Sequence, residues 1–146
     1  MRILIPIAAS FALAAAGCGG SRDTAPPVVE VRGDEYAYVL PARIEGGAVT
    51  MRFANTGEEL HEYALAKLTK PGAVGELREA IAEQDRERFA ELVDDVGGVP
   101  TLSPGEEVAI TRELAAGTYV LLCFVPSSDG MPHVAKGMVG ELTIPG

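Results

Sequence analysis

The chain has 146 residues, of which 47% are hydrophobic, and it carries a formal net charge of −9. This length supplies one domain with a single core. The acidic balance argues against binding to nucleic acid or to anionic lipid headgroups. It favours a basic protein as a partner.

The N-terminal residues have the pattern of an export signal. Arg2 precedes an apolar run over residues 3–16 that only Ser10 interrupts, which is long enough for the core of a signal peptide and short for a membrane span. Residues 15–17 are small and Cys18 follows. This pattern resembles the lipobox of bacterial lipoproteins, although Ala15 stands where that family usually has Leu. The alternative is an ordinary signal peptide with a chance cysteine near its end.

The lipobox resemblance implies a membrane-anchored chain. Residues 1–17 would be the signal peptide, and Cys18 would carry the lipid. The Gly- and Pro-containing residues 18–27 would form a flexible tether, with the domain over residues 28–146. We therefore expect an exported lipoprotein that faces the periplasm or the cell exterior, and we expect it to be a monomer.

Short strand patterns broken by Gly and Pro fill most of residues 28–146. Residues 28–40 predict one strand, or two that break near Gly33. Further strands are predicted by the alternation of Val49, Met51 and Phe53, by that of His61, Tyr63 and Leu65, by Val108 and Ile110, and by residues 118–125 and 139–144. Residues 118–125 are apolar on both faces, which is typical of a central strand.

Residues 73–96 depart from the strand pattern. They lack Pro and are rich in Glu, Arg and Ala, and their apolar residues recur at spacings of three and four. The stripe is interrupted over residues 84–88, so we expect two short helices joined near Asp85, acting as a lid or buttress. About seven short strands with one helical insertion predict an all-β fold, a Greek-key β-sandwich.

The chain has two cysteines, Cys18 and Cys123. If Cys18 carries lipid, Cys123 has no intramolecular partner. An unpaired thiol in an oxidising compartment is then either an inert core residue or a metal ligand.

Cys123, His133 and Met138 lie on one short loop between two predicted strands. A thiolate, an imidazole and a thioether, joined by a second histidine, form the soft trigonal site with a weak axial sulfur that is typical of blue copper centres. The chain has only two histidines, and the second, His61, begins a predicted strand.

These residues resemble the ligand pattern of the cupredoxins, the family of plastocyanin-like and halocyanin-like domains. The family's ligand loop runs Cys, a variable gap, His, four residues, Met. Here nine residues separate Cys123 from His133, and four separate His133 from Met138. The family's first His follows a turn that contains Asn, as His61 follows Asn55.

The cupredoxin resemblance implies one type 1 copper ion held by His61, Cys123, His133 and Met138. It also implies that the loop residue His133 forms an exposed edge through which electrons pass. Two positions depart from the family pattern. Phe124 follows Cys123, where a hydroxyl or amide residue is common, and Glu62 follows His61, where Asn is common.

We therefore predict a membrane-tethered, one-electron carrier that is not an enzyme. Two histidines are too few for a second, catalytic copper site, and no hydrolase or nucleotide-binding motif is found. Three alternatives remain: a copper-trafficking lipoprotein, a metal-free cupredoxin-like binding module, and a zinc site. Met131 is a competing candidate for the axial sulfur.

Overall fold

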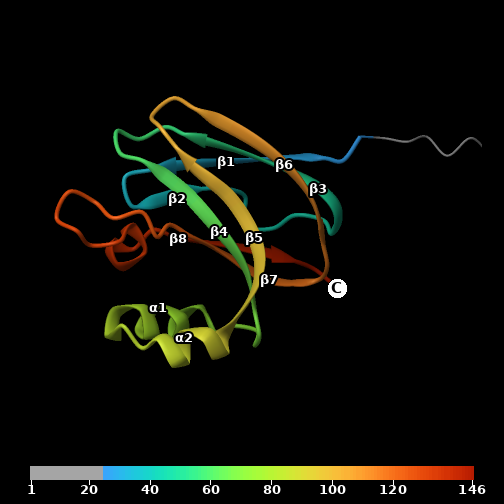
Figure 1. Ribbon diagram of the computed structural model, residues 1–146. Helices are drawn as coiled ribbons and strands as arrows, with labels where there is room; N and C mark the ends of the chain where they lie inside the picture. The colour runs from blue at the N-terminus through green and yellow to red at the C-terminus, as the bar shows by residue number, and fades with distance from the viewer. Residues whose placement is uncertain (1–24) are drawn as a thin grey trace, which may run out of the picture.

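Two four-stranded sheets pack face to face, and two short helices cover the outer side of one of them (Figure 1). This computed structural model describes residues 25–146. The predicted signal peptide, Cys18 and most of the predicted tether lie outside the described residues. The hydrogen bonding of the sandwich begins at Pro27, whose carbonyl oxygen accepts from the Thr50 N–H at 2.9 Å.

The first sheet has the strand order β2-β1-β3-β6. Strands β1 and β3 run parallel, and the other neighbours are antiparallel. Its strands are β1 (Val28–Asp34), β2 (Ala37–Val39), β3 (Gly47–Asn55) and β6 (Glu107–Leu114). Residues 28–40 thus form two strands, and the turn between them lies at residues 35–36, beyond Gly33. At that turn Tyr36 has a left-handed backbone with φ of 59°.

The second sheet has the order β5-β4-β7-β8 and is antiparallel throughout. Its strands are β4 (His61–Leu68), β5 (Val93–Leu102), β7 (Gly117–Leu122) and β8 (Val139–Ile144). Sequence reasoning missed β5. The predicted β-sandwich with a helical insertion is confirmed.

The main core fills the space between the sheets. Alternate side chains of β3 and β4, such as Phe53, Tyr63 and Leu65, point inward, and all three are at most 1% exposed. The rings of Phe53 and Tyr63 meet edge to face with centroids 5.4 Å apart, an arrangement that aromatic pairs prefer.

A second core lies on the opposite face of β4 and β7, beneath the helices. Helices α1 (Val74–Glu83) and α2 (Arg86–Leu92) are joined at Asp85, whose side chain accepts from the Arg88 N–H and caps α2. Buried Leu77 of α1 belongs to the same apolar cluster as Val120 and Leu122 of β7. The helical insertion is therefore a buttress, and it explains why β7 is apolar on both faces.

The insertion ends at Leu92, because Val93 already belongs to β5. Neither helix within residues 25–146 has the length and apolar character needed to cross a membrane.

Candidate metal centre

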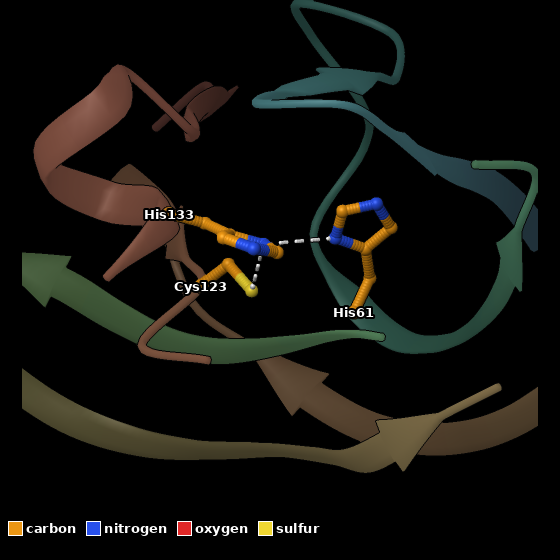
Figure 2. Close-up of side chains that lie close together, drawn as sticks. All are labelled: His61, Cys123 and His133. Carbon is orange, nitrogen blue, oxygen red and sulfur yellow. Dashed lines mark hydrogen bonds between the residues drawn. The ribbon is translucent and has the colours of Figure 1, made fainter. Parts of the chain in front are cut away.

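Three buried side chains meet at one end of the sandwich: one begins β4, and two come from the segment that follows β7. The Nδ1 atoms of His61 and His133 are 3.1 Å apart, and Cys123 Sγ is 3.5 Å from His133 Nδ1. Each of the three residues is 0% exposed. Figure 2 shows His61 Nδ1 and Cys123 Sγ directed at the ring of His133. Among residues 25–146, these are the side chains that could hold a metal ion as a group.

The turn before β4 positions His61, and Asn55 organises this turn. The side-chain amide of Asn55 donates to the carbonyl oxygens of Glu59 at 2.8 Å and of Leu102 at 2.9 Å, and its oxygen accepts from the Gly57 N–H at 3.0 Å. Asn55 is 1% exposed, so these bonds are shielded from water. They fix the path of the chain into His61, the first residue of β4.

Gly57 allows the close approach of the turn to His61. A Cβ atom at this position would lie 2.7 Å from His61 Nε2 and would also collide with the carboxylate of Glu35. The backbone of this turn can pass over the imidazole ring only because residue 57 has no side chain.

The base of the 124–132 loop brings His133 to Cys123. Two backbone hydrogen bonds close this loop: the Val134 N–H donates to the Cys123 carbonyl at 2.7 Å, and the His133 N–H donates to the Val125 carbonyl at 2.9 Å. Cys123 follows the last residue of β7, and His133 begins a short 3₁₀ helix. The side chains of Cys123 and His133 therefore lie close together although the loop between them is long in sequence.

The tip of this loop is tied to itself. The Ser127 hydroxyl lies 2.8 Å from an Asp129 oxygen and 2.9 Å from the Met131 carbonyl. Lys136 of the 3₁₀ helix contacts Asp129 at 2.7 Å. These contacts order the tip through side chains other than the three at the site.

The two methionines near the site differ in burial. Met138 is 0% exposed and lies near His61, whereas Met131 is 47% exposed. The Met138 N–H donates to the His133 carbonyl at 3.0 Å. Met131 lies on the wall of a surface groove between the helices and the loop, which fits loop packing.

Burial controls the protonation of the donors. Burial raises the pKa of the Cys123 thiol, although hydrogen bonds from the backbone N–H groups of Glu62 and Val125 oppose this effect. Burial, together with the neighbouring His133, lowers the pKa of His61. His61 is therefore neutral at pH 7, and a neutral imidazole is the form that binds metals.

The donor set fits a copper ion. Metals bind protein nitrogen at about 2.0 Å and sulfur at about 2.3 Å, so one ion can bridge donors separated by 3.1 and 3.5 Å. Two imidazoles and a thiolate with a buried thioether nearby are the ligands of blue copper sites, whereas zinc sites use no thioether.

Two glutamates that sequence reasoning missed cover the outer edges of the histidines. His133 Nε2 lies 2.8 Å from Glu59 Oε2. His61 Nε2 lies 3.5 Å from Glu35 Oε1 and has no hydrogen-bond partner among the described residues. Glu59 was visible in the turn before His61, but Glu35 comes from the distant β1–β2 turn.

The expectation that His133 forms an exposed edge is wrong, because its side chain is fully buried. Tyr36, at the left-handed position of the β1–β2 turn, packs edge to face against the His133 ring with centroids 5.1 Å apart. Tyr36 and Glu59 thus lie over the edge that the family resemblance would leave open.

Glu62, at the position where many cupredoxins have Asn, connects neighbouring strands. Its carboxylate accepts from the Thr101 hydroxyl at 2.8 Å, which links β4 to β5. Its carbonyl oxygen accepts from the Tyr38 hydroxyl. The strand that carries His61 is therefore held from both sides.

No family model and no curated protein matches the sequence. Solved structures do match. Dithionite-reduced auracyanin from Roseiflexus castenholzii is 25% identical, with 84% of this chain and 100% of that chain covered and a TM-score of 0.55. Auracyanin A, a "blue" copper protein from Chloroflexus aurantiacus, is 24% identical over 82% of this chain and 99% of that chain, with a TM-score of 0.53. Auracyanin B is 23% identical over 85% and 93%, with a TM-score of 0.54.

Proposed function

This chain has the cupredoxin fold, and we propose that it binds one type 1 copper ion and carries single electrons. The observation that carries the proposal is the convergence of two Nδ1 atoms and one Sγ atom in a fully buried site. The likeness to the auracyanins, one of which is described as a blue copper protein, supports it.

Each residue of the site has a defined part in this function. His61 and His133 would hold the copper through ring nitrogens, Cys123 would hold it as a thiolate, and Met138 would add a thioether sulfur as a weaker ligand. Copper in such a site supplies one-electron chemistry, changing between Cu(II) and Cu(I). The hydrogen bonds at the base of the loop hold His133 and Cys123 in place, so the donors move little when the charge changes.

The route of the electron follows from burial. His133 is covered, whereas Phe124 directly follows Cys123 and is 45% exposed. Phe124 also lines the groove beside the helices. The shortest covalent path from the thiolate to the surface therefore runs through Phe124, and we place electron exchange there.

Lipid on Cys18 would hold this carrier at the outer face of a membrane, in the periplasm or at the cell exterior. The chain before Pro27 would act as the tether. The net charge of −9 favours a basic redox protein as the partner.

The first test is an optical spectrum of the full chain, purified from membranes in mild detergent, after addition of Cu(II) and removal of excess metal. We expect one copper per chain and an intense visible thiolate-to-copper band. Cys123→Ser should remove the band, and Cys18→Ser should keep it while releasing the protein from membranes. A colourless wild-type protein without stoichiometric copper would contradict the proposal.

A metal-free binding module is the second candidate. A groove of about 660 Å³ lies between the helical insertion and the ligand loop, and its lining includes Ile81, Phe89 and Val134. Such an apolar groove is typical of sites for small ligands. This function would be favoured if the spectrum showed no copper site.

A further inference from the structure

The contact between Glu59 and His133 has a consequence for the proposed copper site. A neutral imidazole carries one N–H, and an ionised carboxylate can only accept. The distance of 2.8 Å between His133 Nε2 and Glu59 Oε2 therefore places the proton on Nε2. The lone pair is left on Nδ1, the atom that faces His61 and Cys123.

We propose that Glu59 is a positioning residue that holds His133 in the Nε2–H tautomer, with Nδ1 directed at the metal, and that its charge stabilises Cu(II) relative to Cu(I). This inference rests on the proposed copper-binding function. Carboxylates that accept from the outer nitrogen of a metal-bound histidine fix the ring and make it a stronger donor.

The backbone and the carboxylate of Glu59 are both held by hydrogen bonds within the protein. Its carbonyl oxygen accepts from Asn55 and its N–H donates to Glu35 at 3.1 Å. Its second carboxylate oxygen lies 3.4 Å from the Tyr36 hydroxyl, which donates to it. Glu59 is therefore a preorganised acceptor.

The partial burial of the pair strengthens its effect. His133 is fully buried, and the Glu59 side chain is 32% exposed. A charge close to the metal and partly shielded from water acts more strongly than the same charge on the open surface. The extra negative charge favours the more highly charged Cu(II).

The test compares Glu59→Gln and Glu59→Leu with matched changes at Glu58. Glu58 is the neighbouring residue, its side chain is exposed, and it makes no side-chain hydrogen bond within the described part of the chain. Glu58→Gln and Glu58→Leu thus remove the same charge one residue away. All proteins are full chains in detergent.

The first readout needs no metal. The ¹⁵N chemical shifts of the His133 ring in the metal-free chain report which nitrogen carries the proton. We expect the Nε2–H tautomer in the wild type and in Glu59→Gln, whose amide oxygen can still accept, and a mixed population in Glu59→Leu. The Nδ1–H tautomer in the wild type would overturn the proposal, whether or not copper binds.

The second readout is the affinity for each oxidation state, with the reduction potential. Loss of such an outer partner costs about 10- to 100-fold in metal affinity, and here Cu(II) affinity should fall more than Cu(I) affinity. A tenfold difference between the two losses raises the potential by about 59 mV. Glu59→Gln should raise the potential with an unchanged tautomer, and this conservative variant decides the matter if Glu59→Leu does not fold.

The two kinds of failure are distinguishable. If both Glu59 variants match their Glu58 controls in tautomer, affinity ratio and potential, Glu59 has no positioning role. If the wild type binds no copper, the proposed function fails, while the metal-free tautomer still reports on the contact itself.

Discussion

A methyl group added at Gly57 should disturb both the packing beside His61 and the binding of copper. The new Cβ would lie 2.7 Å from His61 Nε2, whereas ordinary contacts begin at 3.4 Å. The carboxylate of Glu35 can move away only by giving up its hydrogen bonds from the Glu58 and Glu59 N–H groups, and His61 is fully buried. The ring must therefore shift by the difference between these distances, which changes its position relative to His133, whose Nδ1 is only 3.1 Å from His61 Nδ1.

Gly57→Ala should lower the free energy of unfolding of the metal-free protein by about 1–3 kcal/mol, the usual cost of overpacking. Copper affinity should fall as well, since the spacing of the donors changes. The backbone of Gly57 does not need a positive φ, so strain in the backbone does not contribute. Urea unfolding with and without copper measures both effects.

Gly75→Ala is the matched control. Gly75 lies in α1, and a Cβ there meets nothing within 4 Å. This variant should gain about 0.5–1 kcal/mol, because alanine is favoured over glycine in a helix. The reasoning about residue 57 is wrong if Gly57→Ala unfolds at the wild-type urea concentration and binds copper as tightly.

Three further predictions concern other parts of the molecule. Leu77→Ala should lower the free energy of unfolding, measured in urea, by about 2–5 kcal/mol, because Leu77 of α1 is 0% exposed. The visible band should stay unchanged, and a shifted band would mean that the helical insertion affects the metal site. Hydrogen bonds from the backbone N–H groups of Glu58 and Glu59 lower the pKa of Glu35 from 4.5 to about 2. The stabilisation from Glu35 is therefore complete above pH 4.5 and is lost as the pH falls toward 2. Over this range the free energy of unfolding of the wild type should fall more steeply than that of Glu35→Gln. Parallel plots of unfolding free energy against pH would contradict this. Phe124→Gln, which adds no charge, should keep the visible band and slow electron exchange with small redox proteins in stopped-flow experiments. An unchanged rate would exclude the route through Phe124.

The parts of the fold with regular local patterns were predictable. Strand β8 has the predicted bounds, and the alternation of His61, Tyr63 and Leu65 does place these residues on one buried face of β4. The three clustered donors were also predictable, because few residue types can bind a soft metal and the chain has few of them.

Strand β5 could not be predicted, because its sequence contains two aspartates, two glycines and Pro100. Such residues are tolerated at the edge of a sheet, and β5 lies at the edge, with two register shifts against β4. Gly98 is required there, because a Cβ would collide with the Tyr63 carbonyl. This reason appears only once the strands are paired.

The contact of Glu35 with His61 could not be predicted from the sequence, for a similar reason. Glu35 reaches the turn before His61 because β1 and β3 pair in parallel, which brings Gly33 opposite Asn55. That pairing is nonlocal, and neither segment alone carries a signal for it. The same pairing carries Tyr36 over His133 and closes the edge that the family resemblance had left open.

In the loop over residues 124–132, the residues that set the spacing of the metal donors differ from those that shape the loop's surface. The hydrogen bonds from Val134 to Cys123 and from His133 to Val125 set the donor spacing at its base. Ser127 and Asp129 order its tip. Substitutions or insertions at the tip can therefore change the surface that a partner meets without altering the metal site. In such a loop, the surface offered to a partner and the spacing of the metal donors depend on different residues.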